Sequence, residues 1–366
     1  MTLPDAGRVA LYSDPNAPFE IASFPVRAPL DGEALVRVSM STICRSDIHT
    51  YQGHRPGPCP GLPGHEIVGH IVALGKGLTH DMRGDTLSVG DRVTWSEYFI
   101  PGSGYFSDVL DLPQKSAGVE KYGHMAATTP PHHHGGFGEY CYILPKSWIL
   151  KLPDSLSDAE AAPLNCGVAT MVAVTEAAEI RLGATVVIQG LGLLGLYGAA
   201  LARSRGARFV IGLDTHAGRR DLSRSFGADL ALDASMPIAE LAAIIHTHCR
   251  PAGADAVIEV CGSADAIPVG LELVRTGGTF VLAGLVSPNA LVTFDAYRIV
   301  RKMITLRGIY GREMYETWYK MTVMLQSGLD ISPAITHRFP FRDFEAAFAA
   351  ARSGDSGKVI MDWTAA

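Results

Sequence analysis

Two cysteines and one histidine, in three separate segments, have the chemistry to hold a metal ion. They are Cys44 in CRSDIH, His65 in GHE and Cys166 in LNC. Thiolate and imidazole ligands favour zinc over magnesium or calcium. Three ligands from distant segments are typical of a catalytic zinc, whose fourth position stays open to water or substrate. Each residue taken alone is also compatible with a packing role, because a lone cysteine is usually a small buried apolar side chain.

A run of glycines indicates a second kind of site. Gly190, Gly192 and Gly195 fit G-x-G-x-x-G, between the apolar segment 184–189 and the small-residue segment 196–202. Between a strand and a helix, such glycines allow a tight turn, close approach of the backbone to a pyrophosphate, and close helix packing. The helix N-terminus then offers free N–H groups to phosphates. The run predicts a dinucleotide site, with an ordinary tight turn as the alternative.

One carboxylate bears on which dinucleotide would bind. Asp214 ends the next apolar segment, 19 residues after Gly195. A carboxylate there accepts hydrogen bonds from the ribose hydroxyls and repels a 2′-phosphate, which favours NAD over NADP. Arg219 and Arg220 follow closely, and either would reverse the preference if it reached a 2′-phosphate. The prediction is NAD.

Two kinds of scaffold must position these residues. Residues 1–160 hold short β-like runs between glycines and prolines, which predicts a compact all-β unit; examples are 34–40, 65–74 and 138–144. After about residue 158, apolar strands alternate with helical patterns, which predicts a parallel sheet and an α/β fold. The expected strands are 184–190, 208–214, 255–262, 278–286 and 304–311, with helices at 196–206 and 218–228. The tail adds helical patterns at 315–328 and 342–354 and a strand at 357–363.

Composition excludes several classes of protein. The 366 residues suffice for about two domains, and the net charge of −6 disfavours a nucleic-acid partner. The uncharged stretch between Arg181 and Arg203 is long enough to cross a bilayer, but its glycines indicate a buried strand and helix instead of a membrane span. Six scattered cysteines and an N-terminus without an apolar run favour the reducing cytoplasm.

The motifs occur in an order that resembles one family. CRSDIH, GHEIVG, GDRV, LNC and GLGLLG are similar to the pattern of the zinc-dependent medium-chain alcohol dehydrogenases, over essentially the whole chain. The resemblance implies a GroES-like β-barrel catalytic domain at 1–160, a doubly wound Rossmann NAD-binding domain at 161–308, and a return to the catalytic domain at 309–366. It also implies a site in the cleft between the domains, a small alcohol or carbonyl substrate, and a homodimer or homotetramer.

The resemblance assigns roles to residues that match the motifs. Cys44, His65 and Cys166 match the ligands of the catalytic zinc. Four neighbouring residues match roles around the metal: Glu66 is the acidic neighbour that can approach it, Asp47 the carboxylate that orients the imidazole, and Ser46 and His49 the proton relay. Lys358 matches a position that supports the ligands. Arg45, Thr170 and Arg219 match positions that contact the cofactor, in addition to the glycines and Asp214.

Other residues depart from the family pattern. Many relatives hold a structural zinc with four cysteines after GDRV, whereas 98–116 contains no cysteine and has Gly102, Tyr105, Asp108 and Ser116 at those positions. We therefore expect one catalytic zinc and no structural zinc. The run His132, His133 and His134 is predicted to be an exposed polar loop, with a place in the substrate cleft as the alternative. The cysteines predicted to serve in packing are Cys59, Cys141, Cys249 and Cys261.

The two ends of the chain point to different substrates. The N-terminal half, with CRSDIHTYQG and GDRVTWSEY, is similar to alcohol dehydrogenases associated with phosphonate catabolism, and the C-terminal GIYGREMYETWYKM resembles L-threonine 3-dehydrogenases. Arg312 would suit an anionic substrate group, or else a surface ion pair. Trp95 and Tyr98 would form an aromatic pocket wall, or else pack in the core.

Three functions therefore remain for experiment. The prediction is a zinc- and NAD-dependent dehydrogenase of a small secondary or primary alcohol. The first alternative is a zinc-free, NADPH-dependent quinone or enone reductase of the same fold, which an enzyme without bound zinc would support. The second is a non-enzymatic dinucleotide-binding protein, which has no need of Ser46 and His49.

Overall fold

The computed structural model describes residues 3–100, 102–110, 112–249, 253–287, 289–311, 314–353 and 356–365. The chain divides into two compact units. The first unit comprises Met1–Cys166, Glu313–Trp318 and Ile335–Ala366. The second comprises Gly167–Arg312 and Tyr319–Ala334. The C-terminal segment therefore belongs with the N-terminal half, although almost 150 intervening residues form the second unit.

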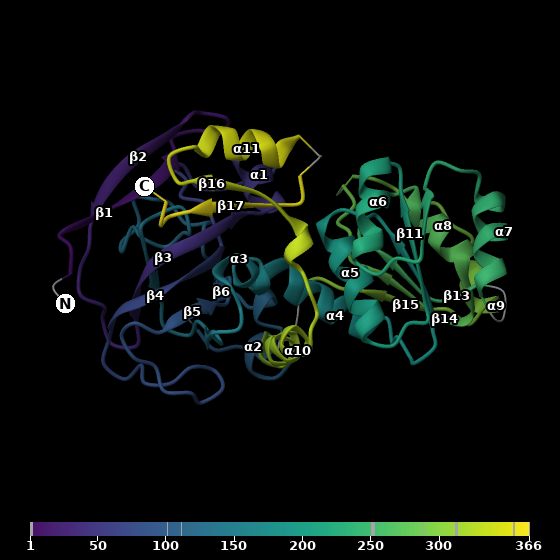
Figure 1. Ribbon diagram of the computed structural model, residues 1–366, viewed down its shortest axis with the longest axis horizontal. Helices are drawn as coiled ribbons and strands as arrows, with labels where there is room; N and C mark the ends of the chain where they lie inside the picture. The colour runs from purple at the N-terminus through teal and green to yellow at the C-terminus, as the bar shows by residue number, and fades with distance from the viewer. Residues whose placement is uncertain are drawn as a thin grey trace. The chain divides into compact units, whose positions relative to one another are not determined.

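A seven-stranded sheet forms the frame of the first unit (Figure 1). Its order is β16-β17-β3-β4-β5-β9, with β8 also paired to β3. Its strands are β3 (Ala34–Ile43), β4 (Glu66–Leu74), β5 (Arg92–Trp95), β8 (Tyr140–Ile143), β9 (Ile149–Lys151), β16 (Ile335–Pro340) and β17 (Lys358–Asp362). β3 and β17 are antiparallel neighbours with Thr42 opposite Ile360, so the last strand of the chain lies against the strand that precedes Cys44.

Shorter elements surround this sheet. The strands are β1 (Ala6–Tyr12) paired with β2 (Phe19–Pro25), and β6 (Tyr98–Phe99) paired with β7 (Glu120–Lys121). The helices are α1 (Arg45–Tyr51), α2 (Tyr105–Asp108), α3 (Asp158–Ala161) and α11 (Phe344–Arg352), with a short 3-10 helix at Pro113–Lys115. Another 3-10 helix, Ser332–Ala334, belongs to the second unit. An aromatic cluster holds α11 in place, because Phe19 of β2 packs against Phe344, Phe348 and Tyr51 at ring distances of 4.7–5.5 Å. Such pairs stabilise beyond the apolar area that they bury.

The second unit is built on a six-stranded, wholly parallel sheet. Its order is β12-β11-β10-β13-β14-β15, which is the doubly wound arrangement in which the order of the strands reverses between β10 and β13. The strands are β10 (Thr185–Gln189), β11 (Phe209–Asp214), β12 (Leu230–Asp233), β13 (Ala254–Glu259), β14 (Val274–Leu282) and β15 (Thr305–Gly308). The alternation in the sequence predicted the other strands, but the short β12 was missed.

Helices connect the parallel strands, as crossover connections require. They are α5 (Leu193–Ser204), α6 (Ala217–Ser225), α7 (Ile238–His248), α8 (Ala266–Leu273) and α9 (Ala296–Arg301). Two further helices lie outside these connections: α4 (Ala169–Ala177) precedes β10, and α10 (Met314–Gln326) follows β15. The uncharged stretch after Arg181 forms β10 and α5, both largely buried, as predicted. In the described parts of the chain, the helices lack the combination of length and apolar character that spanning a membrane would demand.

Candidate active site

Four residues bring metal-ligating atoms together in the first unit. One ligand atom from each of Cys44, His65, Glu66 and Cys166 lies within 4.8 Å of the other three. Cys44 precedes α1, His65 and Glu66 stand at the start of β4, and Cys166 lies in a π-helical turn, Leu164–Val168. Segments more than 100 residues apart in the sequence therefore meet at one point. His65 and Glu66 have no exposed surface.

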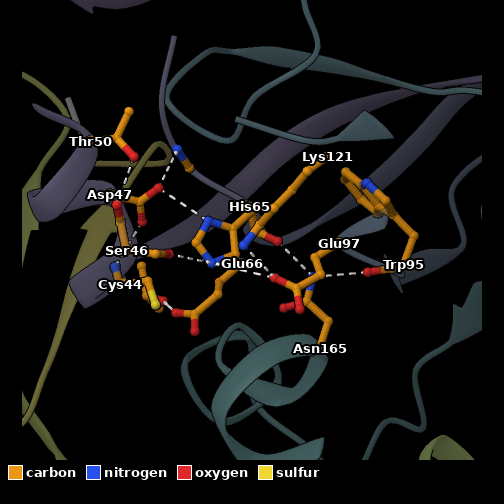
Figure 2. Close-up of polar contacts among 12 residues, drawn as sticks. Cys44, Ser46, Asp47, Thr50, His65, Glu66, Trp95, Glu97, Lys121 and Asn165 are labelled. Atoms are coloured by element: carbon orange, nitrogen blue, oxygen red, sulfur yellow. Dashed lines mark hydrogen bonds and ion pairs between the residues drawn. The ribbon is translucent and has the colours of Figure 1, made fainter. Parts of the chain in front are cut away.

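Asn165 fixes the turn that carries Cys166. Its side-chain amide donates hydrogen bonds to the backbone oxygens of His65, at 2.7 Å, and Trp95, at 2.9 Å (Figure 2). Asn165 is 1% exposed, so these bonds are shielded from water. The amide thereby ties the Cys166 turn to the backbone of another ligand.

Asp47 orients the imidazole of His65. Its Oδ1 lies 3.1 Å from His65 Nδ1, and its Oδ2 accepts a hydrogen bond from the backbone N–H of Cys44 at 2.9 Å. With Nδ1–H donating to Asp47, the lone pair of Nε2 is left for a metal ion. Burial lowers the pKa of His65, but Asp47 and Cys44 raise it by more, to about 10, so a metal ion would bind Nε2 in exchange for its proton. The same carboxylate thus positions two of the ligands.

Glu66 has one oxygen engaged and one left over. Its Oε2 accepts hydrogen bonds from Lys358 Nζ, at 2.6 Å, and from the hydroxyl of Thr42. Its Oε1 is buried and has no hydrogen-bond partner among the residues that the structure describes. Burial raises the pKa of Glu66 to about 7, against the opposing effect of Lys358. A buried, unpaired carboxylate oxygen is costly, and a cation beside it would remove that cost.

The two thiols of the cluster affect each other. A hydrogen bond from Cys166 lowers the pKa of Cys44 well below its ordinary value. The same contact, followed by burial, raises the pKa of Cys166. The pair therefore takes its first negative charge at Cys44, and a bound cation would favour the second, since metal ligation deprotonates a thiol.

A second glutamate–lysine pair lies on the other side of His65. Glu97 Oε2 is 3.6 Å from His65 Nε2 and forms an ion pair with Lys121 Nζ at 2.8 Å (Figure 2). Nearby, the ring of His124 is centred 5.6 Å from that of His65. Within the described part of the chain, the Nε2 atom of His124 is buried without a hydrogen-bond partner. Burial lowers the pKa of His124 to about 3, so this imidazole is neutral.

The glycine run forms a tight turn between β10 and α5. Gly190 has a φ of +93°, a backbone conformation that residues with a side chain rarely adopt. A Cβ on Gly195 would lie 1.9 Å from the backbone oxygen of Gly190, so the helix can start this close to the strand only with glycine there. A Cβ on Gly192, in contrast, would meet no atom within 4 Å. The turn is therefore closed at its base and open beside Gly192.

Asp214, at the end of β11, braces this turn. Its Oδ2 accepts a hydrogen bond from the backbone N–H of Leu191, and its Oδ1 from that of His216, both at 2.8 Å. Arg219 Nη1 lies 3.9 Å from the same carboxylate, whereas Arg220 Nη1 donates to the backbone oxygen of Asp214. The negative charge predicted to read the ribose thus lies directly under the glycine turn.

Comparison with known proteins finds the same two parts. An alcohol dehydrogenase GroES-like domain matches residues 30–154, and a zinc-binding dehydrogenase domain matches residues 194–327. An L-threonine 3-dehydrogenase of Rhizobium etli is 34% identical, over 97% of this chain and 98% of its own length. This chain is a member of the zinc-dependent medium-chain alcohol dehydrogenases. The predicted family and α/β fold class are confirmed.

Further relatives agree with this assignment. An L-threonine 3-dehydrogenase of Paraburkholderia phymatum is 35% identical, over 91% of this chain and 92% of its own length. The crystal structure of an alcohol dehydrogenase from Thermotoga maritima superposes with a TM-score of 0.90 at 29% identity, covering 98% of this chain and 99% of that one. The dehydrogenase is therefore an oxidoreductase of the type that uses zinc and a nicotinamide cofactor.

The donors of the cluster fit a zinc ion. Two thiols, one imidazole oriented through its other nitrogen, and one unpaired carboxylate oxygen offer the sulfur, nitrogen and oxygen ligands that zinc accepts. Between 98 and 116, in contrast, Tyr105 is 63% exposed and Ser116 is buried. The absence of a structural zinc there stays a prediction from the missing cysteines.

The other predicted residues take varied places. Ser46 Oγ lies 3.5 Å from His65 Nε2, and His49 follows three residues later on the same helix, α1. Trp95 is 1% exposed and packs edge-on against Tyr122, while Tyr98 is half-buried under Lys121. Arg45 is exposed, and Thr170 is half-buried in α4 of the second unit. Arg312 lies outside the described residues.

Two expectations about polar residues were wrong. His133 and His134 are fully buried, because their Nε2 atoms pair with the backbone oxygens of Phe24 and Ala126, while His132 stacks on Phe24 at 4.7 Å. Cys59 and Cys261 are exposed instead of packed in a core, whereas Cys141 and Cys249 are buried. Backbone pairing in a folded loop thus buries histidines that the sequence pattern placed at the surface.

Sequence reasoning missed four residues at the site: Asn165, Glu97, Lys121 and His124. Two of them stood inside motifs that were already singled out, since Asn165 precedes the predicted ligand and Glu97 lies between Trp95 and Tyr98. Lys121 and His124 follow a loop of no recognisable motif. The signal available for Glu97 was a carboxylate between the aromatic residues of the GDRVTWSEY segment.

Proposed function

We propose that this dehydrogenase oxidises a small alcohol with NAD, using one zinc ion held by Cys44, His65 and Cys166. The observation that carries the proposal is the convergence of these donors with a carboxylate oxygen of Glu66 at one buried place. Glu66 would approach the metal when ligands exchange, and Lys358 would hold the carboxylate back between exchanges. A zinc in this place supplies Lewis acidity that lowers the pKa of an alcohol.

The residues of α1 would move the proton of that alcohol. Ser46 and His49 are three positions apart on one helix and so share a face. Burial, followed by Arg45, lowers the pKa of His49, so its imidazole is neutral and able to accept a proton at pH 7. Ser46 would pass the proton on, and His49, which is half-buried, would release it to water.

The cofactor would be NAD, bound at the turn of the second unit. Support comes from Asp214, whose carboxylate lies under the glycine turn and would repel a 2′-phosphate. Arg219, 3.9 Å from that carboxylate, is partly neutralised by it. The open space beside Gly192 would accept the pyrophosphate. Thr170 and Arg45 belong to the proposal as further cofactor contacts.

The substrate would be a polar alcohol with an anionic group, such as a threonine-like or a phosphonate-bearing one. Relatives that match over nearly the whole chain act on L-threonine according to their names. The charged pair Glu97 and Lys121 beside the ligands favours a polar substrate over a purely apolar one. Tyr98 would border the pocket, and Trp95 would support it from the core.

A second copy of the chain would cover part of the second unit. β15 is the edge strand of the parallel sheet, and exposed apolar side chains lie on and near it: Leu291, Tyr297, Val300, Met303 and Leu306. An uncovered edge of this kind invites pairing with another strand. We therefore include a homodimer or homotetramer in the proposal. A cytoplasmic setting is part of it too, because both thiols of the site must stay reduced to bind a metal.

The test is formation of NADH from NAD with L-threonine, a 2-hydroxyalkylphosphonate and neutral secondary alcohols. We expect turnover that a strong chelator abolishes and added zinc restores. NADP in place of NAD should give at least about tenfold lower kcat/KM, as expected for one unfavourable charge contact. The zinc content of the purified protein, measured by mass spectrometry, is the readout that does not depend on activity.

Two outcomes would contradict the proposal. A protein that purifies without zinc and reduces quinones or enones with NADPH would be the zinc-free reductase. A protein that binds NADH but converts no alcohol or carbonyl, with zinc present, would be a binding protein. The variant Ser46→Ala adds a control, because it should slow alcohol oxidation and leave the zinc content unchanged.

A further inference from the structure

Lys121 carries a buried charge whose hydrogen-bonding capacity is mostly unused. Among the residues that the structure describes, its ammonium meets the carboxylate of Glu97, at 2.8 Å, and the face of the Tyr98 ring, 5.3 Å from its centre. An ammonium has three donors, and a buried one without acceptors is costly. The side chain is 11% exposed, so it is not fully enclosed by the protein.

The other lysine of the site is different. Lys358 donates a hydrogen bond to Glu66 at 2.6 Å and is 1% exposed, so its ammonium is enclosed beside that carboxylate. Lys121 forms an ion pair with Glu97 at 2.8 Å, and its side chain keeps 11% of its surface exposed. The two pairs flank His65, but only the Lys121 pair leaves donors for a third group.

Lys121 is held near the metal ligands by backbone structure. It lies in β7, directly opposite Tyr98 of β6, and the backbone N–H of Tyr122 donates to the backbone oxygen of Glu97 at 3.0 Å. Glu97 in turn lies 3.6 Å from His65 Nε2. The carboxylate of Glu97 therefore lies between the ammonium of Lys121 and the His65 nitrogen that would bind a metal ion.

The charge of Lys121 is stable. Burial lowers its pKa, but Glu97, followed by Tyr98 and the two thiols of Cys166 and Cys44, raises it by more, above its ordinary value. A cation that keeps its charge beside the reaction centre suits a carboxylate or a phosphonate, because charge-assisted hydrogen bonds are roughly twice as strong as neutral ones.

We infer that Lys121 anchors the anionic group of the alcohol substrate and that Glu97 positions its ammonium. This inference rests on the proposed function and names the feature that makes a substrate acceptable: a carboxylate or phosphonate close to the hydroxyl carbon. Lys121 is thus a specificity-determining residue, supplied by the segment after the cysteine-free loop. The lysine replaces no ligand of the metal and takes no part in hydride transfer.

The experiment compares substrates with and without the anionic group. In Lys121→Met, kcat/KM for L-threonine and for 2-hydroxypropylphosphonate should fall about 10- to 100-fold, mainly through KM, the loss expected for one charge-assisted hydrogen bond. For neutral 2-butanol it should change less than about threefold. The substrate that the unsubstituted enzyme oxidises, L-threonine or the phosphonate, shows whether the anionic group is a carboxylate or a phosphonate. Equal losses on all three substrates, or no loss on the anionic ones, would overturn the inference.

Two further variants guard against a folding defect. Lys121→Met leaves Glu97 buried without its cation, so the double variant Glu97→Gln with Lys121→Met removes both charges and should show the same split between anionic and neutral substrates. Lys151→Met is the matched control, because Lys151 pairs with Asp91 at the surface of the same unit and should leave the split unchanged.

A binding measurement separates this inference from the proposed function. Calorimetry with L-2-aminobutyrate, which has the carboxylate but no hydroxyl, should give at least about tenfold weaker binding to the zinc-loaded Lys121→Met variant than to the unsubstituted protein. If no alcohol is oxidised, the proposed function fails while this binding difference still tests Lys121. If alcohols are oxidised but binding of the probe is unaffected, only the inference fails.

Discussion

The metal-ligand cluster and the dinucleotide turn are built by the chain in different ways. The cluster joins side chains from β4, the start of α1 and a turn near residue 166, and buried charged partners hold those side chains in place. The turn is one contiguous segment that would bind phosphates through its backbone groups, and a side chain on Gly195 would clash with the backbone of Gly190. The cluster should therefore respond to changes of chemistry, and the turn to changes of size.

The largest effect is expected from Cys166→Ser. Loss of one thiolate ligand should reduce bound zinc to below about a tenth of a molar equivalent and turnover by at least about a thousandfold, because a hydroxyl is a poor zinc ligand. NADH binding, measured by fluorescence, should stay within about twofold, since the turn belongs to the other unit. Cys59→Ser, the same change at an exposed thiol, is the control. Full activity of Cys166→Ser would remove Cys166 from the site.

The converse experiment is Gly195→Ala. The added Cβ would lie 1.9 Å from the backbone oxygen of Gly190, so the turn must open. We expect NADH to bind about 10- to 100-fold more weakly, equivalent to about 1.4–2.8 kcal/mol of strain or lost contact, with bound zinc unchanged. In Gly192→Ala the Cβ has free space, so the unfolding midpoint should be unaffected even where cofactor affinity falls. Unweakened binding by Gly195→Ala would show that the turn adapts.

A smaller effect is expected at Asp214, where the turn depends on a side chain. Asp214→Asn removes the negative charge and keeps an oxygen that can accept from the Leu191 N–H. The ratio of kcat/KM for NAD to that for NADP should fall about tenfold, because repulsion of the 2′-phosphate is lost and Arg219 loses its carboxylate partner. Kinetics with both cofactors measures the ratio. An unchanged ratio would mean that another residue reads the ribose.

How far the sequence predicted each region follows from the same difference. Gly190, Gly192 and Gly195 could be assigned from spacing and flanking segments, because the turn is local. Cys44, His65 and Cys166 could be singled out by residue type, but their convergence was implied only by the family resemblance. The structure places them together through contacts such as Asn165 with the His65 backbone, which no spacing in the sequence reveals.

The features that were missed depend on long-range pairing. Lys121 meets Glu97 only because β6 and β7 pair in one register across an intervening loop. His133 is buried because its imidazole finds the backbone oxygen of Phe24, 109 residues away. The strand β12 has only four residues, too few to show a periodic pattern. The roles of charged residues and histidines in loops therefore cannot be predicted until the fold shows which segments lie beside them.

The smallest predicted effect concerns a charged pair remote from the cluster, Glu33 with Arg27. Burial raises the pKa of Glu33, but hydrogen bonds from Arg27, at 2.6 and 2.9 Å, and from the Leu30 N–H lower it by more, below 4.5. Since the folded pKa is depressed, the stabilisation is present at neutral pH and is lost as the pH falls below about 4.5, through the folded value. Glu33→Gln should lower the free energy of unfolding by about 1 kcal/mol at pH 7, discounted for the partly exposed Arg27.

This pair can be followed separately from the second unit. All four tryptophans, Trp95, Trp148, Trp318 and Trp363, belong to the first unit, so their fluorescence during denaturant unfolding reports that unit alone. The difference between the variant and the unsubstituted protein should shrink toward zero at acid pH, and zinc content should be unaffected. Glu20→Gln, at an exposed site of the same unit, should change neither quantity. A pH-independent difference would mean that Glu33 stabilises the first unit through packing and not through its charge.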